Sequence, residues 1–388
     1  MQQFGTMYPA KKNADRLNMD RNGLLEPSVT YFPNGLLPLI EKAHKNDIKF
    51  GVHMMRGVPK QAVYNRLPIK GSDYTCADIA DTTSTCGFCP YNYGVDMTKP
   101  GAQEYYNSVY KKLAEWGVDF VKVDDLIPYP KEIVAVGKAV ANSGRPMVLS
   151  LSPGRFASLD RIPYFRASHM IRTTPDVWDH QPSINGVFNS MRMWQGHGHA
   201  NFWPDHDMIP FGRLCVTKKA ELYPEGADAR LAARGFDRDS EFNDAQKRTF
   251  ITQLAISASP LMLGADLVSF EKYEYDLKLV TNPEVIACVK NGISGVLAKE
   301  EDGVEYWRAG QTLTAINGWM AIFNRSENAK IIQVTTDLLK DPHITKQKIC
   351  FNVSDLWNNK KYMVGENPVQ LSIPANDVAF IRFVETIE

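Results

Sequence analysis

The sequence predicts an α/β fold of the (β/α)8 TIM-barrel type, in which the first two strands are not found, followed by a C-terminal antiparallel β-sandwich domain. From Lys49 to Gly264, short apolar strand-like segments alternate with helix-like segments, which is typical of a parallel sheet. After Asn282 the segments are short, alternate apolar with polar residues and are separated by turn signals, which favours antiparallel strands. We therefore expect a barrel domain over residues 1–285 and a β domain over residues 290–388.

The first part of the barrel region contains one helix–strand pair before a long irregular stretch. Residues 1–32 are polar and contain no convincing strand. Residues 34–46 have the apolar spacing of a helix, and residues 49–55 have the composition of a strand. Residues 58–99 are rich in Gly, Thr, Ser, Asp and Cys, and we expect a long loop that covers the substrate side. Residues 100–116 predict a helix with a proline at its start and a glycine after its end.

The segment 120–126 is short and rich in β-branched residues, and it predicts a buried strand. Because side chains alternate along a strand, Lys122 and Asp124 point to one side and the valines between them to the other. Charged groups on an interior face are costly unless they are paired. The strand ends in a second acid, Asp125. The carboxyl end of a parallel strand is where a barrel carries its catalytic carboxylates.

The alternation of helices and strands continues to Gly264. We expect helices over residues 129–142, 155–166, 184–195 and 244–257, and strands over residues 146–151, 169–174, 200–208 and 260–264. This gives six strands, whereas a closed barrel of this class has eight. Either two strands are hidden in residues 1–32, or the chain as given lacks the first two and the barrel is incomplete at its N-terminus.

The composition excludes several classes of function. The 44 basic and 44 acidic residues cancel, so no net field favours nucleic acid or an acidic membrane. No apolar run is long enough to span a bilayer, and the first residues lack the pattern of a secretory signal peptide, so the compartment stays unassigned. We expect no nucleic-acid and no membrane partner, and a homo-oligomer stays open. The 7 Trp and 16 Tyr suit contacts with sugar rings as well as a large core.

Six cysteines are scattered along the chain, and only Cys86 and Cys89 have the C-x-x-C spacing. A redox or zinc site would need a βαβ context or a second ligand pair, and neither is found. We expect a local disulfide or two free thiols in a loop. His197 and His199, with the nearby acids, are equally poor evidence for a metal, because glycines bound this loop. We therefore expect no metal and no cofactor.

Two further strand ends carry charged residues. Arg172 lies in the strand over residues 169–174, and Asp176 follows it. The segment 203–208 contains Trp203 and Asp207. Carboxylates, together with Lys and Arg donors, match the hydroxyl groups of a sugar. Two alternatives remain open at this point: a site that grips and cleaves a polyhydroxylated substrate, or ion pairs that close the barrel end.

These motifs resemble a known family. The ordered segments 120–125, 150–152, 172–176, 203–208 and 259–266 are similar in order and spacing to the melibiases, the α-galactosidases and α-N-acetylgalactosaminidases of glycoside hydrolase family 27. The resemblance covers most of the chain. It implies a catalytic barrel and a retaining exo-glycosidase that acts on an oligosaccharide or glycoconjugate with two carboxylates.

The resemblance also assigns roles to individual residues. Asp124 matches the nucleophile and Asp176 the general acid/base. Lys122, Arg172 and Asp207 match contacts to sugar hydroxyls, and Trp203 and Ser152 belong to the same predicted substrate site. We expect Lys122 to lower the pKa of Asp124, and burial or the negative partner to raise the pKa of Asp176, against the effect of Arg172. His53 occupies a position where the family usually has tyrosine, and it is either a sugar contact or a packed interior histidine.

The chain departs from the family pattern in two places. The strand with Trp-Asn-Ser-Trp and the following acidic strand end are not found, so a truncated, catalytically inactive carbohydrate-binding relative is a second hypothesis. At the position where α-galactosidases place a glutamate that contacts the 2-hydroxyl, this chain has Ser152, followed by Pro153 and Gly154. These residues leave room for a 2-acetamido group, as in the N-acetylgalactosaminidases, or form only a tight turn after the strand.

Overall fold

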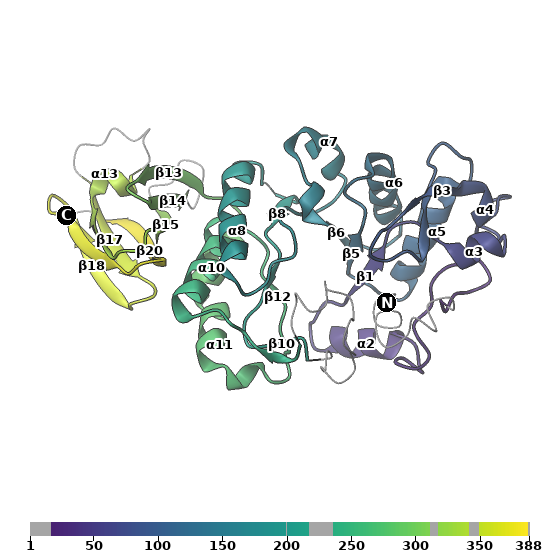
Figure 1. The fold of residues 1–388 in the computed structure, drawn as a ribbon, viewed down its shortest axis with the longest axis horizontal. Helices are drawn as coiled ribbons and strands as arrows, with labels where there is room; N and C mark the ends of the chain where they lie inside the picture. Colours follow the sequence, from purple (N-terminus) through teal and green to yellow (C-terminus); the bar gives the residue numbers. More distant parts are fainter. Residues whose placement is uncertain (1–16, 199, 217–235, 311–316, 341–348, 387–388) are drawn as a thin grey trace. The chain divides into compact units, whose positions relative to one another are not determined.

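The computed structural model describes residues 17–388 apart from 199, 217–235, 311–316, 341–348 and 387–388. Its internal contacts divide the chain into two compact units, Met1–Arg172 and Thr173–Glu388 (Figure 1). The domain division predicted from the sequence, at residues 285–290, stays a prediction.

The first unit is built on a parallel sheet. Its strands, in the spatial order β1-β5-β6-β7, are Gly51–Met55, Phe120–Asp124, Val148–Leu151 and Met170–Arg172. Parallel pairing brings the carboxyl ends of these strands to one edge, because each strand returns through a crossover connection. The strands predicted over residues 49–55, 120–126, 146–151 and 169–174 are thereby confirmed. The closed eight-stranded barrel stays a prediction.

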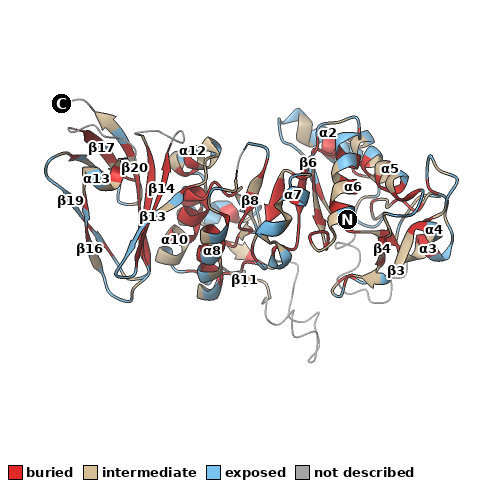
Figure 2. Ribbon diagram, turned by 90° about the horizontal axis from the view of Figure 1, so that it is seen from above, coloured by how far each residue is buried: buried red, intermediate tan, exposed pale blue. Residues whose placement is uncertain are grey.

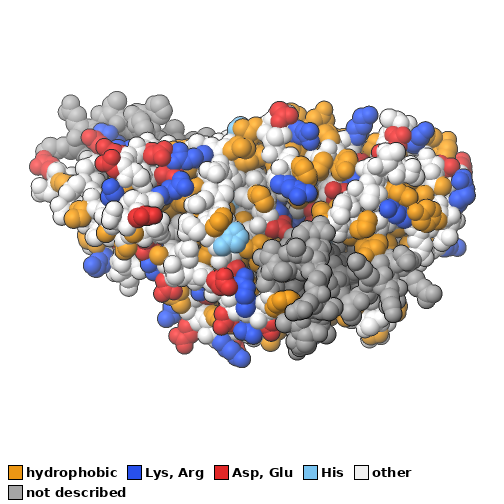
Figure 3. All heavy atoms as spheres, in the orientation of Figure 1, with side chains coloured by type: hydrophobic (Ala, Val, Ile, Leu, Met, Phe, Trp, Pro, Cys, Tyr) orange, Lys and Arg blue, Asp and Glu red, His pale blue; other side chains and the backbone are white. Residues whose placement is uncertain are grey.

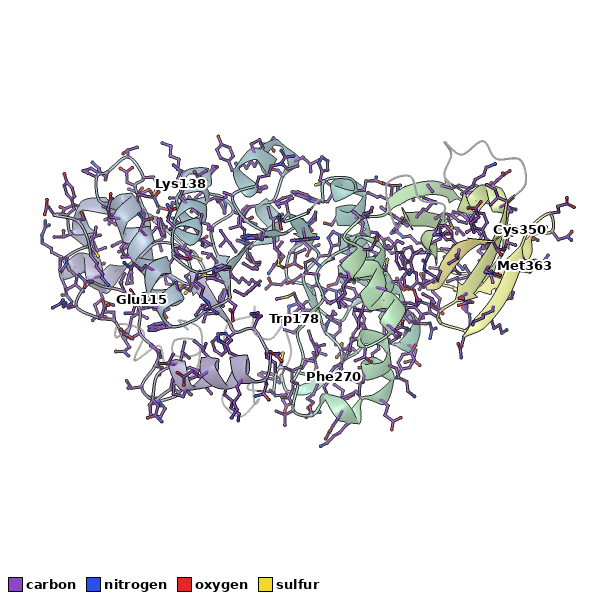
Figure 4. The ribbon with its side chains drawn as sticks, turned by 180° about the vertical axis from the view of Figure 1, so that it is seen from behind. Glu115, Lys138, Trp178, Phe270, Cys350 and Met363 are labelled. Atoms are coloured by element: carbon purple, nitrogen blue, oxygen red, sulfur yellow. The ribbon has the colours of Figure 1, made fainter. Side chains whose placement is uncertain are left out.

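The first unit also contains three amphipathic helices. They are α2, Leu37–Lys45; α5, Ala102–Glu115; and α6, Pro130–Ala141. Helices α5 and α6 lie side by side (Figure 1). In α5 the aromatic and apolar side chains Tyr105, Tyr106, Tyr110 and Leu113 recur at helical spacing and are buried. Figure 4 labels Glu115 at the end of α5 and Lys138 on α6. All three predicted helices are confirmed.

The long loop predicted over residues 58–99 is wrong. This stretch contains an antiparallel sheet in the order β2-β4-β3 and two short helices, with the bounds β2 Val58–Pro59, α3 Lys60–Tyr64, α4 Cys76–Ile79, β3 Ala80–Thr85 and β4 Asn92–Val95. The elements have two to six residues each and β3 is polar apart from Ala80, so neither length nor alternation marks them in the sequence.

One other expectation for the first unit needs correction. The single helix predicted over residues 155–166 is three short turns, Gly154–Phe156, Leu159–Arg161 and α7, Ile162–Phe165, because Ala157 and Ser158 have extended backbones. Of the region 1–32, residues 17–32 contain an isolated bridge between Met19 and Leu25 and no longer strand. Residues 1–16 lie outside the described residues.

The second unit begins with helices and short strands. Their bounds are α8 Gln181–Trp194, β8 Trp203–Asp205, β9 Met208–Ile209, β10 Arg213–Leu214, β11 Arg238–Asp239, α10 Asp244–Ile256, β12 Met262–Leu263, the turn Phe270–Lys272, α11 Glu274–Val280 and α12 Pro283–Asn291. The helices predicted over residues 184–195 and 244–257 and the strands near 200–208 and 260–264 are confirmed. Strands β9 and β12 pair in parallel, and β10 pairs antiparallel with β11.

A β sandwich forms the rest of the second unit. Its six-stranded antiparallel sheet has the order β13-β14-β15-β20-β17-β18, and β16 pairs with β19 in a second sheet. The bounds are β13 Val296–Glu301, β14 Val304–Gly310, β15 Gly318–Asn324, β16 Lys330–Val334, α13 Thr336–Leu339, β17 Cys350–Asp355, β18 Lys360–Val364, β19 Val369–Ile373 and β20 Asp377–Thr386. The predicted antiparallel C-terminal sheet is confirmed.

The larger sheet is buried on both faces, so β14, which is labelled in Figure 2, and β15 are buried along their whole length. One face packs on α8, α10 and α12, with Phe250, Trp307 and Phe323 in the core between them. The other face packs on the β16–β19 pair, with Met320, Ile332 and Phe351 in that core, among others. Burial on two faces explains why the sequence of β15 is nearly all apolar.

The edges of the large sheet are charged. Edge strand β13 has a register shift between Leu297 and Lys299 and ends in Glu300 and Glu301, and edge strand β18 begins with two exposed lysines. In Figure 3, basic and acidic side chains are interspersed over this domain rather than gathered by sign. Among the helices that the structure describes, none has the length and apolar character needed to cross a membrane.

Candidate active site

Asp124 is the last residue of β5, at the carboxyl edge of the parallel sheet. His53, on the neighbouring strand β1, pairs in register with Lys122, so these three side chains share one face of the sheet. The Nε2 atom of His53 lies 3.5 Å from Oδ2 of Asp124, at the outer limit of a hydrogen bond. The backbone N–H of Asp125 donates to Oδ1 of Asp124 over 2.9 Å. The sheet thus brings together three of the predicted site residues.

This environment keeps Asp124 ionised. Burial alone would raise the pKa of its carboxyl group, but the interaction with His53, the charge of Lys122 and the Asp125 N–H together lower that pKa to about 2. The direction is the one expected from the sequence. His53 lowers this pKa more than Lys122 does, whereas the sequence predicts only the effect of Lys122. His53 therefore contacts the Asp124 carboxylate rather than serving only as an interior packing residue.

The second acid of the strand end, Asp125, is held in an ion pair. Its Oδ2 atom accepts from Nε of Arg56 over 3.1 Å and lies 3.0 Å from Nη2, and both side chains are largely buried. The ion-pair alternative, which was open for every acid at these strand ends, therefore applies to Asp125. Burial raises the pKa of Asp125, while the Arg56 charge opposes that change.

The C-x-x-C segment packs beside this edge of the sheet. Cys86 and Cys89 are buried free thiols in a small cluster with Met55, which pairs in register with Asp124. Burial raises the pKa of Cys86 to about 11 and that of Cys89 to about 12. Of the two forms expected from the sequence, the structure has the free thiols, and both stay protonated at neutral pH.

Ser152 follows strand β6, and Arg172 is the last residue of the next strand, β7. Ser152 is fully buried; its N–H donates to the carbonyl oxygen of Val123 over 3.0 Å, and its hydroxyl has no hydrogen-bond partner among the described residues. Its carbonyl oxygen accepts from Leu126, so Ser152 also shapes the loop after Asp124. Arg172 is the buried last residue of β7.

The remaining predicted site residues belong to the second unit. Asp176 lies in the loop before α8 and is exposed, so the burial expected to raise its pKa is not found. Asp207 is buried and accepts the backbone N–H of Val177 at Oδ2 over 2.7 Å, while its own N–H donates to Asp205 over 2.8 Å. The bond from Val177 connects Asp207 to the residue that follows Asp176. Trp203 is a half-buried residue of β8.

Two more side chains support this loop. His206 is buried, and its Nδ1 contacts the Thr173 hydroxyl at 2.8 Å and the Ser190 hydroxyl at 3.2 Å. Burial lowers the pKa of His206 to about 3, so it stays neutral. Trp178, labelled in Figure 4, donates its backbone N–H to Ser183, and its buried indole N–H has no hydrogen-bond partner among the described residues.

Comparison with known proteins supports the resemblance stated from the sequence. No protein-family model matches the chain. The structure of a family 27 β-L-arabinopyranosidase from Geobacillus stearothermophilus is 33% identical, with a TM-score of 0.82, and the match covers 94% of this chain and 82% of that one. A protein of Bacillus halodurans C-125, proposed to be an α-N-acetylgalactosaminidase, is 30% identical with a TM-score of 0.79, covering 97% of this chain and 86% of that one. The chain belongs to glycoside hydrolase family 27.

The curated relatives are α-galactosidases that are more distant in sequence. Alpha-galactosidase 2 of Arabidopsis thaliana is 24% identical over 364 residues, which cover 89% of this chain and 72% of that protein. The protein is a glycoside hydrolase, and the recognition of the family from its ordered motifs is confirmed. Its substrates are therefore glycosides.

Sequence reasoning missed two charged side chains near the candidate site, Arg56 and Glu132. Arg56 directly follows β1, and Glu132, its second partner, lies within α6. A usable signal existed for Arg56, because a charged residue just beyond a buried strand needs a partner, whereas the position of Glu132 in a helix gives no such signal. The described residues contain no cluster of three or more potential metal ligands. His199, one of the histidines considered for a metal, lies outside the described residues.

Proposed function

We propose that the protein is a retaining exo-glycosidase that removes a terminal sugar of galactose configuration. The candidate substrates are α-linked galactose, α-linked N-acetylgalactosamine and β-L-arabinopyranose, which has the same ring configuration as α-galactose without the hydroxymethyl carbon. The observation that carries the proposal is the ionised Asp124 carboxylate at the carboxyl end of a parallel strand in a family 27 chain.

In this mechanism Asp124 is the nucleophile and Asp176 the general acid/base. An oxygen of Asp124 forms a bond to the anomeric carbon while the bond to the leaving oxygen breaks and Asp176 gives that oxygen its proton. Asp176 then takes a proton from water, whose oxygen attacks the anomeric carbon and releases Asp124. Two inversions give net retention. The mechanism needs the two carboxyl groups about 5–5.5 Å apart, and exchange of protons with solvent suits the exposed position of Asp176.

The other predicted residues would bind the sugar. Lys122 and Arg172 offer cationic donors to hydroxyl groups, Asp207 offers a carboxylate acceptor, and Trp203 offers an aromatic face. His53 would contact a hydroxyl next to the anomeric carbon, since it already contacts Asp124. The small side chain of Ser152 would leave space for either a hydroxyl group or a larger substituent at the 2-position of the sugar.

The test offers three p-nitrophenyl glycosides to the purified protein: the α-galactoside, the α-N-acetylgalactosaminide and the β-L-arabinopyranoside. Turnover of at least one, with proton NMR showing that the first free sugar keeps the anomeric configuration of the substrate, is expected. Turnover with the opposite anomer released first would exclude the retaining mechanism. A folded protein that binds these sugars but hydrolyses none would support the inactive relative instead.

Single substitutions then test the roles. Asp124→Asn keeps the size of the side chain and should lose about 10⁴-fold or more in kcat, because the nucleophile is gone. Asp119→Asn is the matched control, since Asp119 precedes the same strand and is also buried and ion-paired. Azide should restore turnover of activated glycosides to the smaller Asp124→Gly variant, with a glycosyl azide of inverted configuration as the product. An active Asp124→Asn variant would remove Asp124 from the mechanism.

A further inference from the structure

Arg56 is a buried cation with an unusually complete set of partners. Its guanidinium donates to Asp125 through Nε over 3.1 Å, to Glu132 through Nη1 over 2.7 Å and to the Ser84 hydroxyl through Nη2 over 3.0 Å, and Nη2 also lies 3.0 Å from Oδ2 of Asp125 in the ion pair. The same group stacks on the ring of Tyr129, 3.5 Å from its centre. Only 2% of the Arg56 side chain is exposed. A planar guanidinium that is bonded along its edge and stacked on its face has no freedom to turn.

The partners of Arg56 are themselves fixed from outside. Glu132 is buried in the first turn of α6 and accepts from the Tyr106 hydroxyl and from the backbone N–H of Val95. Asn92 donates its side-chain amide to the carbonyl oxygen of Arg56 over 2.8 Å. Helices α5 and α6 and strand β4 therefore each hold one side of this group. Burying these charged groups costs desolvation free energy, and the removal of one partner leaves an unpaired buried charge that destabilises the fold.

Two sets of contacts, each with a backbone hydrogen bond, connect Arg56 to Asp124. The N–H of Arg56 donates to the carbonyl oxygen of Asp124 over 3.0 Å. On the other side, the Arg56 guanidinium holds the carboxylate of Asp125, whose backbone N–H donates to Oδ1 of Asp124. Asp125 has a φ of 60°, a left-handed conformation that non-glycine residues adopt only when their surroundings hold them there.

We propose that Arg56 and Asp125 are positioning residues, which fix the Asp124 carboxylate for attack on the anomeric carbon. The inference rests on the proposed function, because it presumes that Asp124 is the nucleophile. The ion pair with Arg56 holds Asp125 in its left-handed turn, the turn aims the Asp125 N–H at Oδ1, and Oδ2 is left beside His53. Neither Arg56 nor Asp125 touches the sugar in this scheme. Their contribution is the orientation of one carboxylate.

The rate of the nucleophilic attack depends strongly on the position of the Asp124 carboxylate. A carboxylate oxygen must approach the anomeric carbon in line with the departing oxygen, and a misplacement of about 1 Å can cost about 10²-fold in rate. Substrate binding depends on other side chains, so loosening Asp124 should lower kcat far more than it raises KM. A residue that only stabilises the fold would change the amount of active protein instead, and leave kcat per folded molecule the same.

The pH dependence gives a second readout. The groups that face Asp124 are His53 from β1, Lys122 from β5, and Asp125 with the thiols of Cys86 and Cys89 from the adjoining loops. Arg56→Lys keeps the positive charge but loses the planar contacts that hold Asp125, so the hydrogen bond from the Asp125 N–H to Asp124 should weaken. That bond favours the ionised form of Asp124, and its loss disfavours it. The acidic limb of kcat/KM should therefore move to higher pH in Arg56→Lys.

The test compares Arg56→Lys and Asp125→Ala with two further variants. Asp125→Asn is the conservative rescue, because asparagine tolerates the left-handed conformation and can still accept from Arg56. Arg145→Lys is the matched control, since the Arg145–Asp119 ion pair lies before the same strand, at the end opposite Asp124. We expect Arg56→Lys and Asp125→Ala to lower kcat by about 10- to 100-fold with KM within about threefold, and Asp125→Asn and Arg145→Lys to keep kcat within about threefold.

Several results would overturn the inference. They are a folded Asp125→Ala variant with unchanged kcat, a folded Arg56→Lys variant with unchanged kcat and acidic limb, or an Arg145→Lys variant that loses as much kcat as Arg56→Lys. If Arg56→Lys does not fold, the comparison of kcat between Asp125→Ala and Asp125→Asn tests the inference. If the wild-type protein turns over none of the three aryl glycosides, the proposed function fails. A crystal structure of Asp125→Ala then decides the positioning claim, and an Asp124 carboxylate in its original place refutes it.

Discussion

The stability of the first unit should depend on pH through Asp124. Its pKa in the folded protein is about 2, below the value of about 3.9 that an aspartate has in an unfolded chain. A lowered pKa stabilises the folded state above the unfolded value, and the contribution disappears as the pH falls through the folded value. A difference of about two pKa units corresponds to about 2.5 kcal/mol.

The assay compares the wild type with Asp124→Asn, whose side chain cannot titrate. Amide hydrogen exchange in β5 gives the free energy of opening of this unit in both proteins. The difference between the two should fall by roughly 1 kcal/mol from pH 6 to pH 3 and by about 2 kcal/mol from pH 6 to pH 2. A difference that stays flat over this range, or that is lost above pH 5, would refute the account of how His53 and Lys122 hold Asp124 ionised.

Three other predictions concern the rest of the molecule. His206→Gln should flatten the pH dependence of unfolding between about pH 6.5 and pH 3, because the lowered pKa of the wild-type histidine costs stability as the pH falls through that window; urea titrations at several pH values check it. Phe250→Ala should lower the free energy of unfolding of the second unit by about 3–5 kcal/mol, since Phe250 is fully buried between helix and sheet; an unchanged urea midpoint would contradict this. Dialysis against EDTA should leave turnover of the aryl glycosides unchanged, because the proposed mechanism uses only carboxylates.

The sequence predicted the strands of the parallel sheet well, because buried strands carry a strong local signal. The segment 120–126 is apolar, bounded by turn residues and of the right length, and β5 occupies it. The same holds for the helices, whose apolar residues recur at helical spacing, as in α5 and α6. The long stretch 58–99 failed for the opposite reason, since its strands are too short and too polar to stand out.

The sequence places three residues of the candidate site together, but it does not predict their supporting contacts. His53, Lys122 and Asp124 share a face because strand alternation and parallel register require it. The partners Arg56 and Glu132 are 76 positions apart in the chain. Local pattern carries no information on such a contact, so the ion pair that holds Asp125 had to come from the structure.

The charged edges of the large β-sheet bear on how copies of this protein can associate. An uncovered edge strand offers free N–H and C=O groups to any other extended chain, but desolvating charged side chains opposes such pairing. One edge here presents the run from Lys299 to Glu301 and the other presents Lys360 and Lys361. Sheets of two molecules would have to bury these charges in order to merge. Any homo-oligomer is therefore expected to assemble through helices or loops, and not by extending one continuous sheet.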